Sequence, residues 1–419
     1  MQQVKTGRKV LILGAHQSYV RANAGGYVRL REFIKYLPRD ISCEVIDISP
    51  SIYADLLPDE KIIKINLPHY IKLLISNVFI IGVLLERLYI GIHIYRIGGK
   101  LINSEHIHLI YVPIGELLHL YLPALLLKRH FPHIKVVVDI LNFEYIQDSF
   151  IQLVRRFIIY KHRIPTAICL ALTHYISFRI TKYTINDIDH IFTVSPLLIS
   201  EIKKIYFKKT IDFTPSGVNI PSYSSITKFK KKIYLCAYVG RVTEQKGIFN
   251  ILDVWHRLIS IKPEAKLVIA GIIDKETHSL VIKKIKEANL EKNIDLMGEV
   301  SEERKREILM SSEIFLHLAN NEPLFPVIGI LEGLSFGLPC ITFNIPAIAS
   351  QKDSDKKLGI FISPNYDCSA VMRQIVEIHC LSKKEKACLS SKSKSFAQDF
   401  CWENIAKKEF SVLSKLLYT

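Results

Sequence analysis

The sequence predicts an α/β protein with two Rossmann-like domains that face a cleft. Strand-like and helix-like patterns alternate along the chain, as in a sheet covered by helices. Ile134–Ile140 (IKVVVDI) is a mostly apolar run, typical of a parallel strand that is covered on both faces. The alternation starts afresh at the apolar strand Tyr234–Val239. We therefore expect an N-terminal domain at 1–206, a linker region at 207–233, a second domain at 234–399 and a C-terminal helix at 400–419.

The composition is that of a globular protein with a strong positive charge. Of the 419 residues, 49% are hydrophobic and 23% are charged, which is enough for two full cores. The formal net charge of +16 favours an anionic partner: nucleic acid, an anionic membrane surface or a phosphorylated substrate. The eight cysteines show no C-x-x-C spacing, and the apolar run before Gly14 is too short for a signal peptide. Both features predict a cytoplasmic protein.

The first domain opens with a strand, a glycine loop and a helix. The strand is Lys9–Leu13, and Gly25-Gly26 lie in the loop before an amphipathic helix. This order is typical of a doubly wound sheet, in which such glycines let the backbone approach a ligand. We therefore expect Gly25 and Gly26 to contact the ligand, with an ordinary flexible loop as the alternative. Further strands are expected at Ser42–Ile48 and His106–Pro113, and Asp189–Ser195 is expected to close the sheet.

Two stretches of this domain suggest contact with a membrane. Residues 73–85 carry no charge, but the run is shorter than the roughly 18 residues that a membrane span needs. A buried helix is the favoured interpretation, and insertion at a membrane interface is the alternative. From Ser149 to Asn186 there is no acidic residue, so this segment is the better candidate for binding an anionic membrane surface. The alternative is a basic helix face that is exposed to solvent. Its cations lie among bulky apolar residues: Arg155, Arg156, Lys161, Arg163, Arg179 and Lys182.

Polar residues surround the end of the strand at Ile134–Ile140. Ligands of open α/β sheets bind beyond the carboxyl ends of the strands. Asp139, Asn142 and Glu144 are therefore candidates for contact with a donor or an acceptor.

The second domain carries the richest candidate site. In the stretch Asn320–Phe343, Pro326 predicts a helix start and Gly337 predicts its end. The free N–H groups at such a helix start can bind phosphate. Gly240-Arg241 and Lys246-Gly247 flank a short loop after a strand, where glycine lets the chain turn and both cations can reach one place.

The motifs of this half resemble those of a known enzyme family. Besides Asn320–Phe343, they are TPSGVNI (Thr214–Ile220), YVGRVTEQKG (Tyr238–Gly247), KLVIAG (Lys266–Gly271) and FCWENIAKKEF (Phe400–Phe410). Together they resemble the second half of a family 4 glycosyltransferase of the GT-B fold, a retaining enzyme that uses nucleotide-sugar donors. The N-terminal half resembles the family in its layout, and the resemblance implies that the last helix returns to brace the first domain.

The resemblance also implies roles for individual residues. Arg241 and Lys246, beside Gly240, bind the donor diphosphate and oppose the charge that grows on it, while Glu332 binds the ribose. Nine residues separate Glu322 from Glu332, two more than the family spacing, so strict counting places Leu324 at the first glutamate. Two bulged loop residues would keep Glu322 as a catalytic residue. A histidine that many members carry is replaced by Leu141.

We therefore expect a retaining glycosyltransferase that uses no metal or other cofactor. Its partners would be a nucleotide-sugar donor, a lipid-linked or saccharide acceptor and the anionic inner face of the membrane. A nucleotide-sugar epimerase of the same fold and a non-catalytic nucleotide-sugar-binding relative are the alternatives. Nucleic acid is disfavoured because the basic residues alternate with bulky apolar ones, and no nucleic-acid module is present.

Overall fold

The protein forms two separate α/β units. The computed structural model describes residues 8–14, 25–49, 52–115, 117–141, 148–159, 164–205, 210–221, 232–320, 322, 326–349 and 359–418. The first unit comprises Met1–Pro215 together with Ile405–Thr419, and the second comprises Ser216–Asn404. The chain thus passes between the units twice, at Pro215 and at Ile405.

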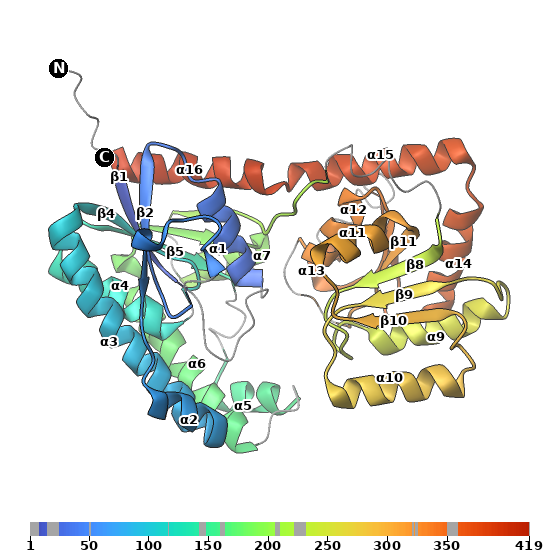
Figure 1. Cartoon of the computed structure of the whole chain (residues 1–419), viewed down its shortest axis with the longest axis horizontal. Helices are drawn as coiled ribbons and strands as arrows, with labels where there is room; N and C mark the ends of the chain where they lie inside the picture. Colours follow the sequence, from blue (N-terminus) through green and yellow to red (C-terminus); the bar gives the residue numbers. More distant parts are fainter. Residues whose placement is uncertain are drawn as a thin grey trace. The chain divides into compact units, whose positions relative to one another are not determined.

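The first unit is built on a parallel sheet of seven strands, in the order β3-β2-β1-β4-β5-β6-β7 (Figure 1). Because all pairings are parallel, the carboxyl ends of the strands meet at one edge. The strands are β1 Arg8–Leu13, β2 Ile41–Asp47, β3 Ile62–Lys64, β4 Ile107–Val112, β5 Lys135–Ile140, β6 His190–Thr193 and β7 Ile211–Phe213. The sequence-based expectation that Asp189–Ser195 closes the sheet was wrong, because β7, inside the expected linker, pairs with β6.

Helices cover both faces of this sheet. The helices of this unit are α1 Gly25–Lys35, α2 His69–Asn77, α3 Phe79–Glu105, α4 Leu118–His130, α5 Phe150–Ile159, α6 Ile164–Thr184, α7 Pro196–Ile205 and the end of α16, which spans Trp402–Tyr418. Of these, α2 packs on α3 and α5 packs on α6. On one face, α16 packs Phe410 and Leu413 into a core with α1 and alternate residues of β1, β2 and β4. The ring of Phe33 lies 4.3 Å from that of Tyr111 and 4.9 Å from that of Phe410. The C-terminal helix is therefore part of the first hydrophobic core.

The uncharged run at 73–85 does not form the buried helix that was favoured from the sequence. It is divided between α2 and α3 at Val78, and Leu73, Ile81 and Leu84 are exposed. Within the described part of the chain, no helix is both long enough and apolar enough to cross a membrane.

The second unit has a parallel sheet of six strands, in the order β10-β9-β8-β11-β12-β13. The strands are β8 Tyr234–Val239, β9 Leu267–Ala270, β10 Ile294–Gly298, β11 Ser312–His317, β12 Cys340–Phe343 and β13 Ile360–Ser363. The helices are α9 Ile248–Ile259, α10 Lys275–Glu287, α11 Glu302–Met310, α12 Ile328–Ser335, α13 Pro346–Ala349, α14 Cys368–Cys380 and α15 Lys383–Asp399. The expected α/β fold with two parallel sheets is thus confirmed.

Local sequence signals set several helix starts in this unit. The side chains of Asp274 and Ser301 accept hydrogen bonds from backbone N–H groups at the starts of α10 and α11. Ser382 and Glu385 form a reciprocal capping box at α15. Strands β8 and β11 are buried at the centre of the sheet. They share a hydrophobic core with α9, whose Trp255 is fully buried, and with α12. The loops that follow β8 and β11 extend from this buried centre.

Candidate active site

Two loops meet at the carboxyl edge of the second sheet. The loop after β8 ends at Gly247, whose φ of 81° is the left-handed conformation that glycine adopts at little cost. A Cβ at this position would lie 1.7 Å from the carbonyl oxygen of Leu318, so the two loops touch through bare backbone. The backbone N–H of Asn320 donates to the carbonyl of Gln245 at 3.1 Å. The amide of Asn250 donates to Leu318 O at 3.0 Å and to Asn320 Oδ1 at 2.6 Å.

These loops bring a lysine and a glutamate together. Lys246 Nζ forms an ion pair with Glu322 Oε1, and both side chains are mostly buried. His317 Nε2 lies 3.7 Å from the same carboxylate oxygen. Burial lowers the pKa of His317 to about 4, against a smaller opposing effect of Glu322, so its imidazole is neutral at neutral pH. The cluster therefore offers one cation, one carboxylate and one neutral imidazole at the edge where ligands of such sheets bind.

Tyr238 and Arg241 lie beside this cluster. The hydroxyl of Tyr238 donates to the carbonyl of Arg241 at 2.6 Å and thereby fixes the turn after β8. Burial, and then the nearby charge of Glu322, raise the pKa of Tyr238. Arg241 itself is exposed, on the same loop as Lys246.

Glu332 is paired with a lysine that the sequence analysis missed. Lys305 Nζ lies 2.7 Å from Glu332 Oε1 and 2.9 Å from Glu302 Oε2. Burial opposes the charge of Lys305, but the carboxylates of Glu332 and Glu302 outweigh it and raise the lysine pKa. One signal could have pointed to Lys305. It lies in the first turn of α11, where the helix dipole disfavours a cation that has no acidic partner.

Helix α12 begins two residues later than the sequence predicted. Val327 is its N-cap, with an extended backbone and no side-chain cap, and the expected start at Pro326 precedes it. Gly329 in its first turn lies close to the end of β8 and to His317, since a Cβ there would be 3.7 Å from Val239 O and 3.9 Å from His317 Nδ1. The first turn of α12 therefore stands beside the Lys246 cluster. Leu324, the alternative for the first glutamate position, lies outside the described residues.

Gly25 and Gly26 occupy helix rather than loop. They form the first turn of α1, so the prediction of a loop at these residues was wrong. The physical reason is close packing: a Cβ on Gly26 would meet Ile114 Cδ1 at 2.8 Å and Leu141 Cδ1 at 3.4 Å. Ile114 and Leu141 follow the carboxyl ends of β4 and β5. The start of α1 thus lies at the ligand-binding edge of the first sheet, and contact with a donor stays a prediction.

The fold and part of the sequence resemble known glycosyltransferases. Residues 219–392 match the model of the family described as glycosyl transferases group 1. A glycosyltransferase of Rickettsia africae superposes with a TM-score of 0.67 at 13% identity, covering 98% of this chain and 99% of that one. HepE of Anabaena, solved with UDP and glucose, has a TM-score of 0.63 at 14% identity, with 97% and 99% covered. The chain has the GT-B fold of glycosyltransferases.

Two curated relatives share part of this GT-B chain. The phosphatidylinositol N-acetylglucosaminyltransferase gpi3 subunit of Schizosaccharomyces pombe is 22% identical over 174 residues, which are 41% of this chain and 37% of that protein. A phosphatidylinositol N-acetylglucosaminyltransferase subunit of Arabidopsis thaliana is 21% identical over 251 residues, or 57% of this chain and 52% of that protein. The matched segments thus span about half of the length of these relatives or less.

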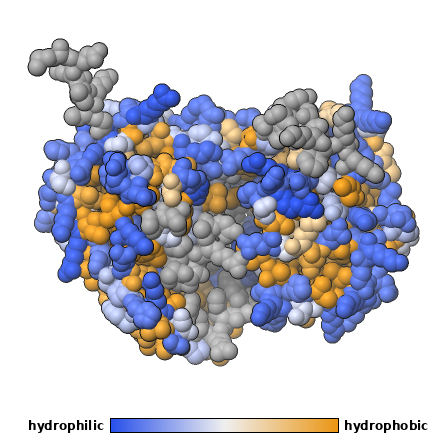
Figure 2. Space-filling model, in the orientation of Figure 1, coloured by the Kyte–Doolittle hydropathy of each residue, from blue (hydrophilic) through white to orange (hydrophobic). Residues whose placement is uncertain are grey.

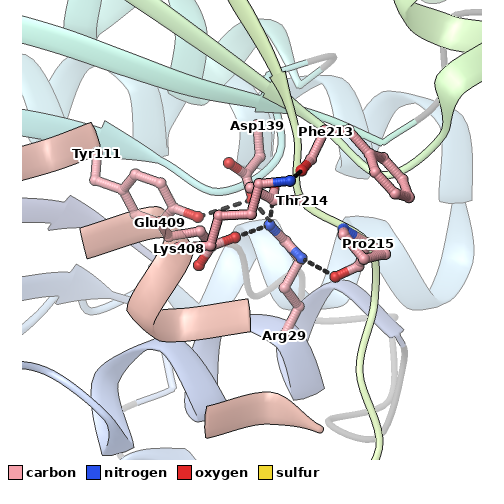
Figure 3. Close-up of polar contacts among 8 residues, drawn as sticks. All are labelled: Arg29, Tyr111, Asp139, Phe213, Thr214, Pro215, Lys408 and Glu409. Carbon is pink, nitrogen blue, oxygen red and sulfur yellow. Dashed lines mark hydrogen bonds and ion pairs between the residues drawn. The ribbon is translucent and has the colours of Figure 1, made fainter. Parts of the chain in front are cut away.

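Asp139, a predicted ligand contact, belongs instead to a buried ion cluster in the first unit of the GT-B chain (Figure 3). Its Oδ2 accepts hydrogen bonds from Arg29 Nε and from the Tyr111 hydroxyl, each at 2.7 Å, and the residue is 1% exposed. This burial argues against a direct contact with donor or acceptor. Asn142 and Glu144, the other two candidates, lie outside the described residues.

Arg29 is the centre of that cluster. Besides Asp139, it binds the carbonyl of Pro215 at 2.9 Å, the hydroxyl of Thr214 at 2.8 Å and the carboxylate of Glu409. Burial and the neighbouring Asp139 raise the pKa of Glu409 to about 7, although Arg29 pulls it down. The available signal in the sequence was an arginine on the apolar face of α1, beside Leu30.

The sequence predicted no metal site. Across the described ranges, no three His, Cys, Asp or Glu side chains are grouped so that they could hold a metal ion. Of the predicted site residues, the structure brings Lys246 and Glu322 into contact, and it places Gly240 and Arg241 on the loop that carries Lys246. It pairs Glu332 with Lys305 on the adjoining helix.

Proposed function

We propose that the protein is a retaining glycosyltransferase. It moves a sugar from a nucleoside diphosphate donor to a lipid-linked or surface-polysaccharide acceptor, at the inner face of the membrane and without a metal cofactor. The observation that carries the proposal is the contact of Lys246 with Glu322 at the carboxyl edge of the second sheet. This pair lies inside the segment that matches the glycosyl transferases group 1 model.

The second unit offers the groups that a departing diphosphate needs. Negative charge grows on the leaving phosphate as the bond to the sugar breaks, and fixed cations stabilise it. Lys246 and the exposed Arg241 lie on one loop, and the first turn of α12, which has no side-chain cap, stands nearby. HepE of Anabaena, a protein of similar fold, was solved with UDP and with UDP-glucose. A nucleoside diphosphate sugar is therefore the donor that we propose here.

The transfer assigns tasks to five residues of the second unit. The bond between the anomeric carbon and the diphosphate oxygen breaks, and the acceptor oxygen bonds to the same face of the sugar. The acceptor proton passes to the leaving diphosphate. Lys246 and Arg241 offset the phosphate charge, Glu322 contacts the sugar, and Glu332 binds the ribose while Lys305 orients it.

The acceptor class rests on the relatives and on the first unit. Two relatives are named phosphatidylinositol N-acetylglucosaminyltransferases. A structure of similar fold, at a TM-score of 0.60 and 13% identity, is a lipopolysaccharide outer core galactosyltransferase. Each of these names includes a lipid or a lipid-linked polysaccharide. The first unit, where we place the acceptor, carries exposed apolar and basic helices that suit such a substrate.

A transfer assay tests this function. Full-length protein is incubated with labelled UDP-, GDP- or ADP-sugars and a lipid extract of the source cell, beside Lys246→Ala and Glu332→Ala. Lys275→Ala, which alters an exposed lysine of α10, is the matched control. We expect one donor to label the lipid fraction, unaffected by EDTA or by Lys275→Ala and lost in both site variants. Release of sugar or nucleotide without an acceptor would favour an epimerase. Nucleotide binding without any turnover would favour a non-catalytic relative.

A further inference from the structure

Two helices of the first unit expose rows of large apolar side chains. In α3 the row recurs every three or four residues along one face: Ile81, Leu84, Leu88, Ile92 and Tyr95. In α6 it recurs every four residues: Ile164, Ile168, Leu172 and Ile176. Hydrophobic residues gather on the first unit in the region of α2 and α3 (Figure 2). Monomeric soluble proteins rarely leave an apolar surface of this extent uncovered.

The sides of these helices that face the protein mix apolar residues with polar and small ones; in α3, Ile90 and Ile94 are buried as well as Glu86. Glu86 is 1% exposed, whereas Leu88, two residues later in α3, is 62% exposed. The buried side of α6 carries Phe178 and otherwise small or polar residues, namely Ala167, Ala171, Ser177 and Thr181. A helix that faces water keeps its large apolar side chains on the inward side, whereas α3 and α6 carry such side chains on the outward side as well. The outward faces of α3 and α6 are therefore suited to an apolar surrounding.

Buried polar groups join α3, α4 and α6 into one layer. Burial, together with the charge of Arg87 in α3, lowers the pKa of His119 in α4 to about 3 and that of His174 in α6 to about 4. The hydroxyls of Tyr121 in α4 and Thr184 in α6 lie 2.9 Å apart. Because α4 adjoins both helices, the two apolar rows belong to a single helical layer.

The exposed charges along most of this layer have one sign; the exception is Glu105, the last residue of α3, which pairs with Lys9. Over His69–Asn103 and Phe150–Thr184, every exposed charged side chain that the structure describes is a cation: Lys72, Arg96, Lys100, Arg155, Arg179 and Lys182. Lys64 and Lys72 also line a hollow of about 210 Å³ at the start of α2, together with Ser49 and Asn66. Apolar rows bordered by cations complement a bilayer with anionic headgroups, where apolar side chains reach the acyl boundary and cations pair with phosphates.

We propose that the outer face of α2, α3, α5 and α6 docks the protein on an anionic lipid bilayer. The apolar rows of α3 and α6 enter the interface without crossing it, and the six cations bind headgroup phosphates. This inference deepens the proposed function, because it names the surface through which a lipid-linked acceptor is reached. Only the link to the acceptor rests on that function; the docking itself does not.

Vesicle binding of the full chain tests the docking surface. Sedimentation with phosphatidylcholine vesicles is compared with sedimentation with vesicles containing phosphatidylglycerol, at two salt concentrations. Leu88→Gln/Leu172→Gln removes one residue from each row. The control Ile261→Gln/Leu280→Gln alters equally exposed residues of the second unit. We expect binding to the anionic vesicles only, lost in the row variant and retained in the control.

Charge reversal provides a second variant, which alters exposed side chains and removes only the surface contact of Arg179 with Tyr175. Arg179→Glu/Lys182→Glu should weaken binding about 25-fold or more, because each basic residue near an anionic surface contributes about fivefold. Lys283→Glu/Lys286→Glu on α10, whose lysines are also exposed, should leave binding unchanged. Equal binding by all variants, or no binding to anionic vesicles, would overturn the proposal. So would self-association abolished by the row variant, because a second copy would then be the occupant.

The two proposals fail independently. Lys246→Ala should abolish sugar transfer yet bind vesicles like the wild type, because Lys246 lies in the second unit. Leu88→Gln/Leu172→Gln should lose transfer to vesicle-embedded acceptor but keep its affinity for the nucleotide. Vesicle binding without transfer would leave docking intact and reject the enzyme proposal, and the opposite result would reject docking alone.

Discussion

Lys246 and Glu322 neutralise each other in the described structure, and this has a consequence for ligand binding. A phosphate that approaches Lys246 must compete with the carboxylate already paired to it. The same carboxylate repels the phosphate charge, since two like charges at such short range interact unfavourably. The two residues therefore act in opposite directions on the affinity for a nucleoside diphosphate.

We expect substitutions of this pair to change nucleotide affinity with opposite signs. Glu322→Gln should tighten the binding of the nucleoside diphosphate about fivefold, equivalent to ~1 kcal/mol. Lys246→Ala should weaken it and lower kcat about 100- to 1000-fold, as loss of a group that stabilises developing negative charge does. Calorimetric titration and steady-state kinetics measure the two effects. Glu291→Gln, an exposed glutamate of the same unit, is the control, and weaker nucleotide binding by Glu322→Gln would contradict this account.

A second prediction at the residue scale concerns the pH dependence of stability. The pKa of Glu409 is raised from 4.5 to about 7 by burial and by Asp139. Between these values the folded state holds a proton that the unfolded state has released, so stability falls as pH rises through this window. Above about pH 7 the loss is complete. Urea unfolding at pH 5 and pH 8 measures the slope.

Glu409→Gln should flatten this slope, because glutamine does not titrate. The difference between wild type and variant isolates Glu409 from the other titrating groups. An unchanged slope would mean that Glu409 is ionised throughout, with Arg29 outweighing the cost of burial.

At the scale of elements, Gly247 connects the two loops of the site. Gly247→Ala should lower the free energy of unfolding by more than about 3 kcal/mol. The new Cβ would overlap the carbonyl of Leu318, and alanine would also be strained in the left-handed backbone conformation. Gly298→Ala is the matched control. Gly298 has a φ of 66° but open space around its Cβ position, so only the backbone cost of about 1–2 kcal/mol applies. Thermal unfolding compares the two, and equal costs would mean that the loops separate easily.

Local patterns predicted most elements but missed contacts between distant residues. The parallel strands were evident from apolar runs such as Ile134–Ile140, because burial on both faces requires them. Strand β7 has only three residues, too few to show a pattern. Gly25 and Gly26 suggested a loop because glycine is a poor helix former, whereas close packing against Ile114 decides their conformation.

The candidate site divides in the same way. Lys246 was predictable because its loop carries a local motif, and Glu322 was placed only as a hypothesis about a bulged loop. Arg29 and Glu409 are 380 residues apart, so no local signal connects them. Likewise, the uncharged run at 73–85 predicted burial, because nothing in the sequence shows which side of α3 turns outward.

At the scale of the whole molecule, the two units carry different tasks in our proposal. The expected donor groups lie in the second unit, Ser216–Asn404, whereas the docking surface lies in the first. A ligand that binds one folded unit stabilises that unit by mass action, by about 2.7 kcal/mol at a ligand concentration of 100 Kd. The response of each unit to nucleotide thus reports where the nucleotide binds.

We expect a nucleoside diphosphate to raise the unfolding temperature of the second unit. At 100 Kd the shift should be about 5–10 °C, since 1 kcal/mol moves Tm by roughly 2–4 °C for a domain of this size. Differential scanning calorimetry of the full chain measures it, and Lys246→Ala should reduce the shift at the same nucleotide concentration. Anionic vesicles should act on the transition of the first unit instead. If nucleotide moved only that transition, the donor would bind near the start of α1, and Lys246 would lose its assigned role.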